Sequence, residues 1–101
     1  MNPNILKQAQ QLQAKLAKAQ EELGTMTTEA SVGGGAIKIV IDGKQQVHSI
    51  TIDPEVVAAD DIQMLQDMLT AAINEAINKS QEMASNHLGK ITGGFNIPGL
   101  F

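Results

Sequence analysis

The sequence predicts a single α+β domain, residues 1–101, in which two long helices flank a short strand-rich middle. Apolar residues recur at helical spacing near both ends of the chain, and apolar and polar residues alternate between these two segments. A length of 101 residues corresponds to one domain. Because the chain has two Phe and neither Tyr nor Trp, we expect a core built from aliphatic side chains and Met.

The first helix is predicted over residues 3–23. Pro3 suits a first helical turn, and Gly24 lies where a C-terminal cap is expected. The apolar positions follow a heptad spacing, which is typical of a narrow seam that packs against another helix. The seam consists of Ile5, Ala9, Leu12, Leu16, Ala19 and Leu23.

Three strands are expected next, over residues 25–32, 36–42 and 46–53, the first of them only weakly marked. In the second strand, Ile37, Ile39 and Ile41 share one face.

The turn between the second and third strands contains Asp42-Gly43, which is typical of a two-residue hairpin loop with positive φ at both positions. In the third strand, Val47 is out of phase with Ile50 and Ile52. This pattern predicts either a β-bulge or a strand covered in part on both faces.

The second helix is predicted over residues 60–88, with Asp60 and Gln63 as a capping box and Gly89 as its end. Its apolar stripe, which includes Leu65 and Leu69, suits it to cover the sheet. Two helices of this length exceed what a three-stranded sheet can cover in a monomer, so we expect a dimer. The candidate core and dimer residues are Leu12, Leu16, Ile39, Ile41, Leu65, Leu69, Phe95 and Phe101.

No catalytic or metal site is predicted. The chain lacks Cys, and His48 and His87 have no third ligand at metal spacing. Gly33-Gly34-Gly35 leads into a strand, unlike a phosphate-binding loop, and no nucleophile–base arrangement can be assembled. We therefore expect no enzyme activity, no cofactor and no small-molecule substrate. The sequence shows no signal peptide and no membrane span, which indicates a cytoplasmic protein.

The charge is unevenly distributed. The net charge is −4, yet residues 1–20 carry three Lys and no acid, whereas residues 51–101 carry two Lys and seven acids. Lys7, Lys15 and Lys18 share one side of the first helix. This stripe is either a solvated flank or a surface for an anionic partner, and a symmetric dimer would present it twice.

Four segments in order are similar to the YbaB/EbfC family of bacterial nucleoid-associated DNA-binding proteins. They are LKQAQQLQAKLAKAQEEL, GGGAIKIVIDGKQQVHSITIDPEVV, DDIQMLQDMLTAAINEAINKSQEM and ITGGFNIPGLF. The resemblance covers essentially the whole chain. It implies an intertwined homodimer of α-β-β-β-α subunits, with a paired sheet as the body and the helices as arms. It also identifies residues 25–32 as the first strand.

The resemblance further implies binding and organisation of DNA at the nucleoid, with possible gene regulation. Because Arg is absent, we expect phosphate-directed, salt-dependent binding with little sequence preference. The alternative is a dimeric protein-interaction module that uses the heptad seam or the apolar tail, residues 89–101, and reaches DNA indirectly. The DNA-binding candidates are Lys7, Lys15, Lys18, Lys38, Lys44, Lys79 and Lys90.

Overall fold

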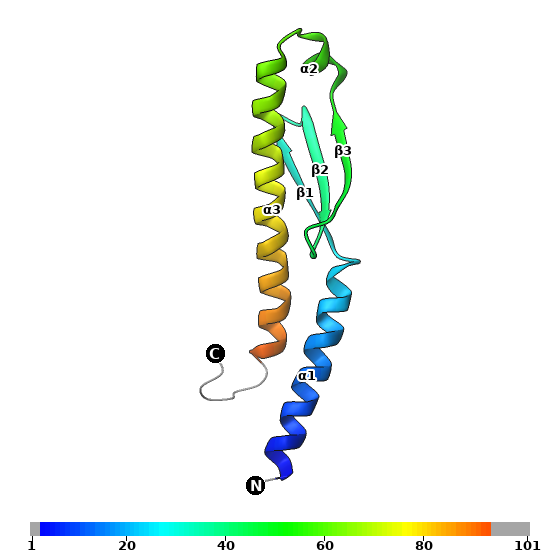
Figure 1. Cartoon of the computed structure of the whole chain (residues 1–101), viewed down its shortest axis with the longest axis vertical. Coiled ribbons are helices and arrows are strands. Elements are labelled where there is room, and N and C mark those ends of the chain that lie inside the picture. Colours follow the sequence, from blue (N-terminus) through cyan, green and yellow to red (C-terminus); the bar gives the residue numbers. More distant parts are fainter. Residues whose placement is uncertain (1–2, 94–101) are drawn as a thin grey trace.

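The computed structural model describes residues 3–93 and has the element order α-β-β-β-α, with one additional short helix (Figure 1). The expected roles of Phe95 and Phe101 lie outside the described residues. The molecule is elongated, with extents of 69 × 22 × 16 Å. Its elements are α1 (Pro3–Leu23), β1 (Thr27–Val32), β2 (Ile37–Asp42), β3 (Val47–Ile52), α2 (Pro54–Ala58) and α3 (Ile62–Thr92).

The three strands form an antiparallel sheet in the order β1-β2-β3, and α3 packs across β1 and β2. Ile37, Ile39 and Ile41 of β2 are completely buried beneath α3. Ala72 and Ala76 face them, and their small side chains let the helix approach the sheet closely. Burial of each Ile contributes about 1.5–3 kcal/mol, so the central strand is the main anchor of this core. Leu65 and Leu69 pack against it while partly buried.

The hairpin between β2 and β3 differs from the predicted two-residue turn. Gln45, rather than Asp42 or Gly43, has a positive φ, of 63°. The Gln45 amide donates to the Asp42 carbonyl at 3.2 Å, and the Asp42 amide donates to the Gln46 carbonyl at 2.9 Å. This is a three-residue loop in which a turn is followed by a left-handed residue.

Of the two alternatives expected for the third strand, the structure shows the β-bulge in β3. Val40 pairs with Ser49, but Ile41 pairs with Val47, so His48 is the extra residue. Because of this shift, the side chains of Val47 and Ile50 point to the same side of the sheet. Their partners Ile41 and Ile39 both face the core on that side.

The start and end of α3 also differ from expectation. Asp61, not Asp60, caps the helix by accepting a hydrogen bond from the Met64 amide at 3.0 Å, while Asp60 has a φ of 55°. The helix continues through Gly89 to Thr92. A helical Gly costs about 1 kcal/mol relative to Ala, which the partly buried residues on both sides of it can offset.

The short helix α2 was not anticipated. It begins at Pro54, and Asp53 caps it by accepting a hydrogen bond from the Glu55 amide at 2.9 Å.

The heptad seam of α1 is buried in part. Leu12, Ala19 and Leu23 are buried and Leu16 is half-buried, because this part of α1 runs beside the C-terminal half of α3 (Figure 1). Ile5, near the start of the same seam, is 63% exposed. The N-terminal part of α1 therefore projects beyond the body as an arm. None of the described helices is long and apolar enough to cross a membrane.

Candidate nucleic-acid interface

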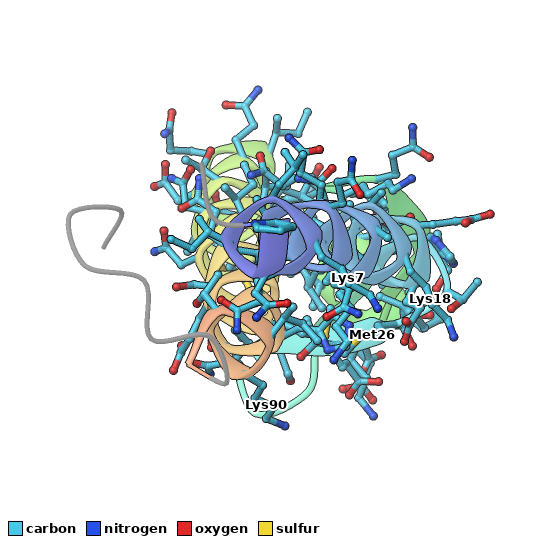
Figure 2. All side chains as sticks on the ribbon, turned by 90° about the horizontal axis from the view of Figure 1, so that it is seen from below. Lys7, Lys18, Met26 and Lys90 are labelled. Atoms are coloured by element: carbon cyan, nitrogen blue, oxygen red, sulfur yellow. The ribbon has the colours of Figure 1, made fainter. Side chains whose placement is uncertain are left out.

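Three of the candidate lysines lie on α1, which presents them to solvent. Lys7, Lys15 and Lys18 are all exposed, and no acid interrupts the helix before Glu21. Figure 2 views the molecule from its N-terminal end and shows Lys7 and Lys18 toward one side, the side on which Lys90 of α3 also lies. We call Lys7, Lys15, Lys18 and Lys90 the basic face.

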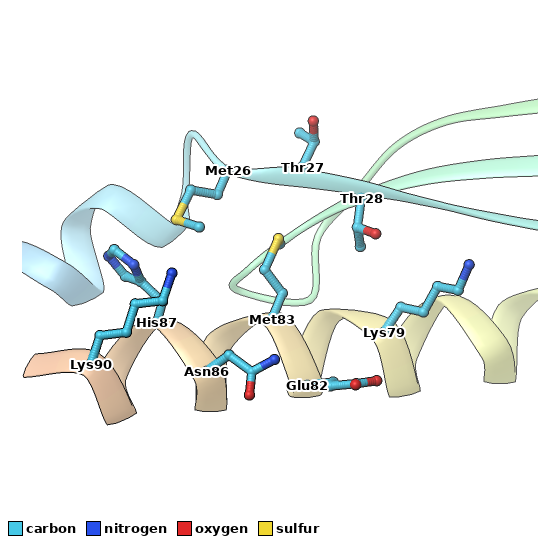
Figure 3. A pocket seen from close by; sticks show the side chains of 9 residues that line it. All are labelled: Met26, Thr27, Thr28, Lys79, Glu82, Met83, Asn86, His87 and Lys90. Carbon is cyan, nitrogen blue, oxygen red and sulfur yellow. The ribbon is translucent and has the colours of Figure 1, made fainter. Parts of the chain in front are cut away.

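A groove adjoins this face between β1 and the C-terminal half of α3 (Figure 3). Met26 and Met83 supply apolar side chains, and Lys90 and Asn86 supply polar ones. Lys90 comes from the last turn of α3, where a positive charge is stabilised by the helix dipole. Glu82 also lines the groove, so its lining carries charges of both signs.

Lys79 also lines this groove, but its ammonium group is engaged by the fold. Its Nζ donates to the Glu29 carbonyl oxygen at 3.0 Å and lies 3.7 Å from Glu75 Oε1. Lys79 therefore ties α3 to β1, and its position indicates a structural role.

Of the remaining two candidates, Lys38 lies away from the basic face and Lys44 lies near the end of α1. The Lys38 side chain passes beside Gly35, at the β1–β2 turn, which is the end of the sheet remote from α1. The Lys44 stem lies beside Gly24, directly after α1. The structure thus does not bring all seven lysines together.

The orientation of α1 is fixed by contacts of the β2–β3 loop with the end of α1 and with α3, which together we call the joint. The Gly43 amide donates to the carbonyl oxygens of Leu23 at 2.9 Å and Met26 at 3.1 Å. A Cβ atom on Gly43 would lie 2.8 Å from Leu23 Cδ2 and 2.9 Å from the Leu23 carbonyl oxygen. From α3, the buried Ser80 hydroxyl donates to the Asp42 carbonyl oxygen at 2.6 Å. The loop therefore holds α1 and α3 in one arrangement.

The Asp42 carboxylate stabilises this joint from within. Its Oδ1 accepts the amides of Lys44 at 2.7 Å and Gln46 at 3.1 Å, and its Oδ2 lies 2.9 Å from His48 Nε2. The His48 hydrogen bond, followed by the Gln46 amide, holds the pKa of Asp42 below its ordinary value of 3.8, although burial acts in the opposite direction. Sequence reasoning missed this cluster; the available signal was an Asp-Gly turn followed by a bulged His.

These residues do not form a catalytic arrangement. The Ser80 hydroxyl is completely buried and donates to a backbone carbonyl instead of to His48. In the described range 3–93, no group of three or more His, Asp or Glu side chains could hold a metal ion.

His87 lies between the two long helices. Its Nε2 is 3.7 Å from Glu22 Oε2 near the end of α1, and this atom has no hydrogen-bond partner among the described residues. From the sequence, His87 was expected only to lie near the C-terminal end of the second helix. The contact provides a second link between α1 and α3.

Comparisons with known proteins agree on one family. The sequence model of the YbaB/EbfC DNA-binding family matches residues 1–95. A nucleoid-associated protein of Desulforamulus reducens is 55% identical over 97 residues, which are 96% of this chain and 92% of the relative. A nucleoid-associated protein of Syntrophobacter fumaroxidans is 52% identical over 97 residues, covering 96% of this chain and 88% of the relative.

The same fold occurs in a solved structure. An uncharacterized protein of Helicobacter pylori, HP0035, matches with a TM-score of 0.76 and 17% sequence identity, over 92% of this chain and 99% of that one. The similarity supports the α-β-β-β-α architecture.

Proposed function

Because the chain belongs to the YbaB/EbfC family of nucleoid-associated DNA-binding proteins, we propose that it binds duplex DNA as a homodimer through phosphate contacts with little sequence preference. Its role is to organise the nucleoid in the bacterial cytoplasm and to influence gene expression. This is a DNA-binding family and not an enzyme family. The observation that supports this proposal best is the basic face, where lysines of α1 and α3 are presented together despite a net charge of −4.

Phosphate contacts account for binding by these side chains. Lys presents a flexible point charge, and the chain has no Arg for bidentate contacts to guanine. Residues 3–93 also contain no Phe, Tyr or Trp on which a base could stack. Recognition through the lysines of the basic face would then depend on the regular spacing of phosphates, which carries little sequence information.

A homodimer is supported by the apolar surface of β3. Val47 and Ile50 pair with buried residues of β2 and point to the same side of the sheet, yet each is 47% exposed because α3 covers only β1 and β2. Ile73 of α3 is also exposed. We call Val47 and Ile50 the apolar strip of β3. We propose that a second copy covers this strip, which would bury the open side of the core and present the basic face twice.

A matched pair of variants tests the DNA interface. Lys18→Glu lies on the basic face, whereas Lys38→Glu makes the same charge change on the remote part of the sheet. In fluorescence anisotropy titrations of a labelled duplex, we expect Lys18→Glu to weaken binding by tenfold or more and Lys38→Glu to have a much smaller effect. Equal losses would show that only net charge matters and would contradict this placement of the site.

The second candidate function is a protein-interaction module. It is favoured by Ile5 and Leu6, which are 63% and 51% exposed on the projecting part of α1. The apolar tail, residues 89–101, lies mostly outside the described residues. A partner captured after nuclease treatment, together with purified protein that does not bind DNA, would favour this function over direct DNA binding.

A further inference from the structure

The long axis of the molecule separates two surfaces of opposite charge. At one end, α1 carries three lysines and no acid before Glu21. At the other end lie α2 and the start of α3 (Figure 1). Residues 45–78 contain no Lys or Arg but include Asp53, Glu55, Asp60, Asp61, Asp67 and Glu75. Lys38 also lies toward this end, at the β1–β2 turn, but the acids outnumber it, so the two ends have complementary charges.

The acidic end contains an apolar groove, between the end of β1 and the first turns of α3. Val32, Met64, Met68 and Ala71 supply its apolar lining, and Asp61 and Asp67 lie at its rim. We call these six residues the acidic groove.

The groove is held in place by its surroundings. The Met68 methyl group lies so close to Gly33 that a Cβ there would be 2.5 Å from it. Asp61 Oδ1 accepts the Met64 amide, and Asp67 Oδ1 accepts the Gln63 side-chain amide at 3.1 Å. The surface suits a segment that is both apolar and basic.

The projecting start of α1 has this combination. Ile5 and Leu6 are the exposed apolar pair, and Lys7 follows them directly. Because β1 and β3 are opposite edges of the sheet, the acidic groove also lies away from the apolar strip of β3.

We propose that the start of α1 from one copy docks into the acidic groove of another, with Ile5 or Leu6 on the Met side chains and Lys7 beside Asp67. Donor and acceptor surfaces differ, so the contact is heterologous, and because they lie toward opposite ends of a molecule 69 Å long we propose that it repeats end to end. Copies would then associate end to end into chains. The contact does not involve Lys15, Lys18 or Lys90. It accounts for the concentration of acids at one end of a protein that binds an anionic polymer.

Engineered cysteines test the contact, since the natural sequence contains none. A chain that carries both Ile5→Cys and Met64→Cys is oxidised at low salt and separated on a denaturing gel. We expect a ladder of three, four and more linked chains. The matched control, Ile5→Cys with Thr51→Cys, places the second thiol on an exposed strand position outside the groove, and no ladder is expected.

Three results would overturn the proposal. A product that stops at two linked chains would mean a closed contact within a dimer. A ladder of equal strength from the control would mean random collision. Cross-linking of Met64→Cys to other proteins of a bacterial extract, but not to the Ile5→Cys chain, would assign the groove to a different basic partner.

Charge reversal provides an independent measurement by sedimentation velocity. Lys7→Glu alone or Asp67→Lys alone should abolish species larger than the proposed dimer. The two changes together should restore these larger species. Failure of the double variant to restore them would contradict the pairing of these residues. Asp67→Lys should retain DNA binding, since Asp67 lies at the opposite end from the basic face, so loss of assembly can be distinguished from failure of the proposed DNA function.

Discussion

Replacement of Gly43 by Ala tests the joint that orients the α1 arm. The new Cβ would lie 2.8 Å from Leu23 Cδ2, 2.9 Å from Leu23 Cβ and 2.9 Å from the Leu23 carbonyl oxygen. A rotamer change can relieve only the first contact, because the other two atoms move only with the last turn of α1.

The expected cost follows from these contacts. Overpacking of a tight site costs about 1–3 kcal/mol. Displacement of the helix also weakens the hydrogen bond from the Gly43 amide to the Leu23 carbonyl, which contributes about 1 kcal/mol. We therefore expect Gly43→Ala to lower the free energy of unfolding by about 2–4 kcal/mol.

Urea denaturation followed by far-ultraviolet circular dichroism measures this change at one fixed protein concentration. Gly89→Ala is the matched control, because a Cβ at Gly89 meets nothing within 4 Å and the residue is helical. This control should raise the free energy of unfolding by up to about 1 kcal/mol. If Gly43→Ala were as stable as the natural sequence, the joint described here would be wrong.

Three further predictions concern separate parts of the molecule. Because the folded-state pKa of Asp42 is lowered, its carboxylate contributes stability above pH 3.8 that is lost as the pH falls through the lower folded-state value. Asp42→Asn should therefore be less stable than the natural sequence at neutral pH and should lose less stability on acidification, as measured by urea midpoints across pH. Ile50→Asp should shift the sedimentation coefficient toward that of a monomer, whereas Thr51→Asp, on the opposite face of β3, should not; equal behaviour would refute the proposed dimer surface. Lys79→Met should lower stability by roughly 1 kcal/mol, through loss of the hydrogen bond to Glu29, and leave DNA affinity nearly unchanged; a large loss of affinity would place Lys79 in the DNA interface.

Much of the fold could be predicted from the sequence, because its main elements depend on local periodicity. The alternation of Ile37, Ile39 and Ile41 identified the buried face of β2, and the position of Val47 in the alternation predicted the bulge as one of two alternatives. The turn was wrong because the Asp42 side chain organises a longer loop by accepting two backbone amides. Such a cluster depends on contacts that local pattern does not contain.

The site was less predictable than the fold. The common side of Lys7, Lys15 and Lys18 followed from helical geometry alone. Lys90 lies on the basic face, and Lys79 donates a hydrogen bond to the Glu29 carbonyl oxygen. Both findings depend on how α3 packs against α1 and β1, which are distant from it in sequence. The expected boundary at Gly89 was wrong for a similar reason, since tertiary packing can outweigh the weak helix propensity of Gly.

The most direct test of the account is the salt dependence of duplex DNA binding by the natural sequence. Four lysines on each of two protomers could neutralise up to about eight phosphates, so the logarithm of the binding constant should fall with the logarithm of salt concentration with a slope of up to about −7. Affinities for duplexes of unrelated sequence should be similar. Absence of binding at about 50 mM salt, or a slope near zero, would contradict phosphate-directed binding by the basic face.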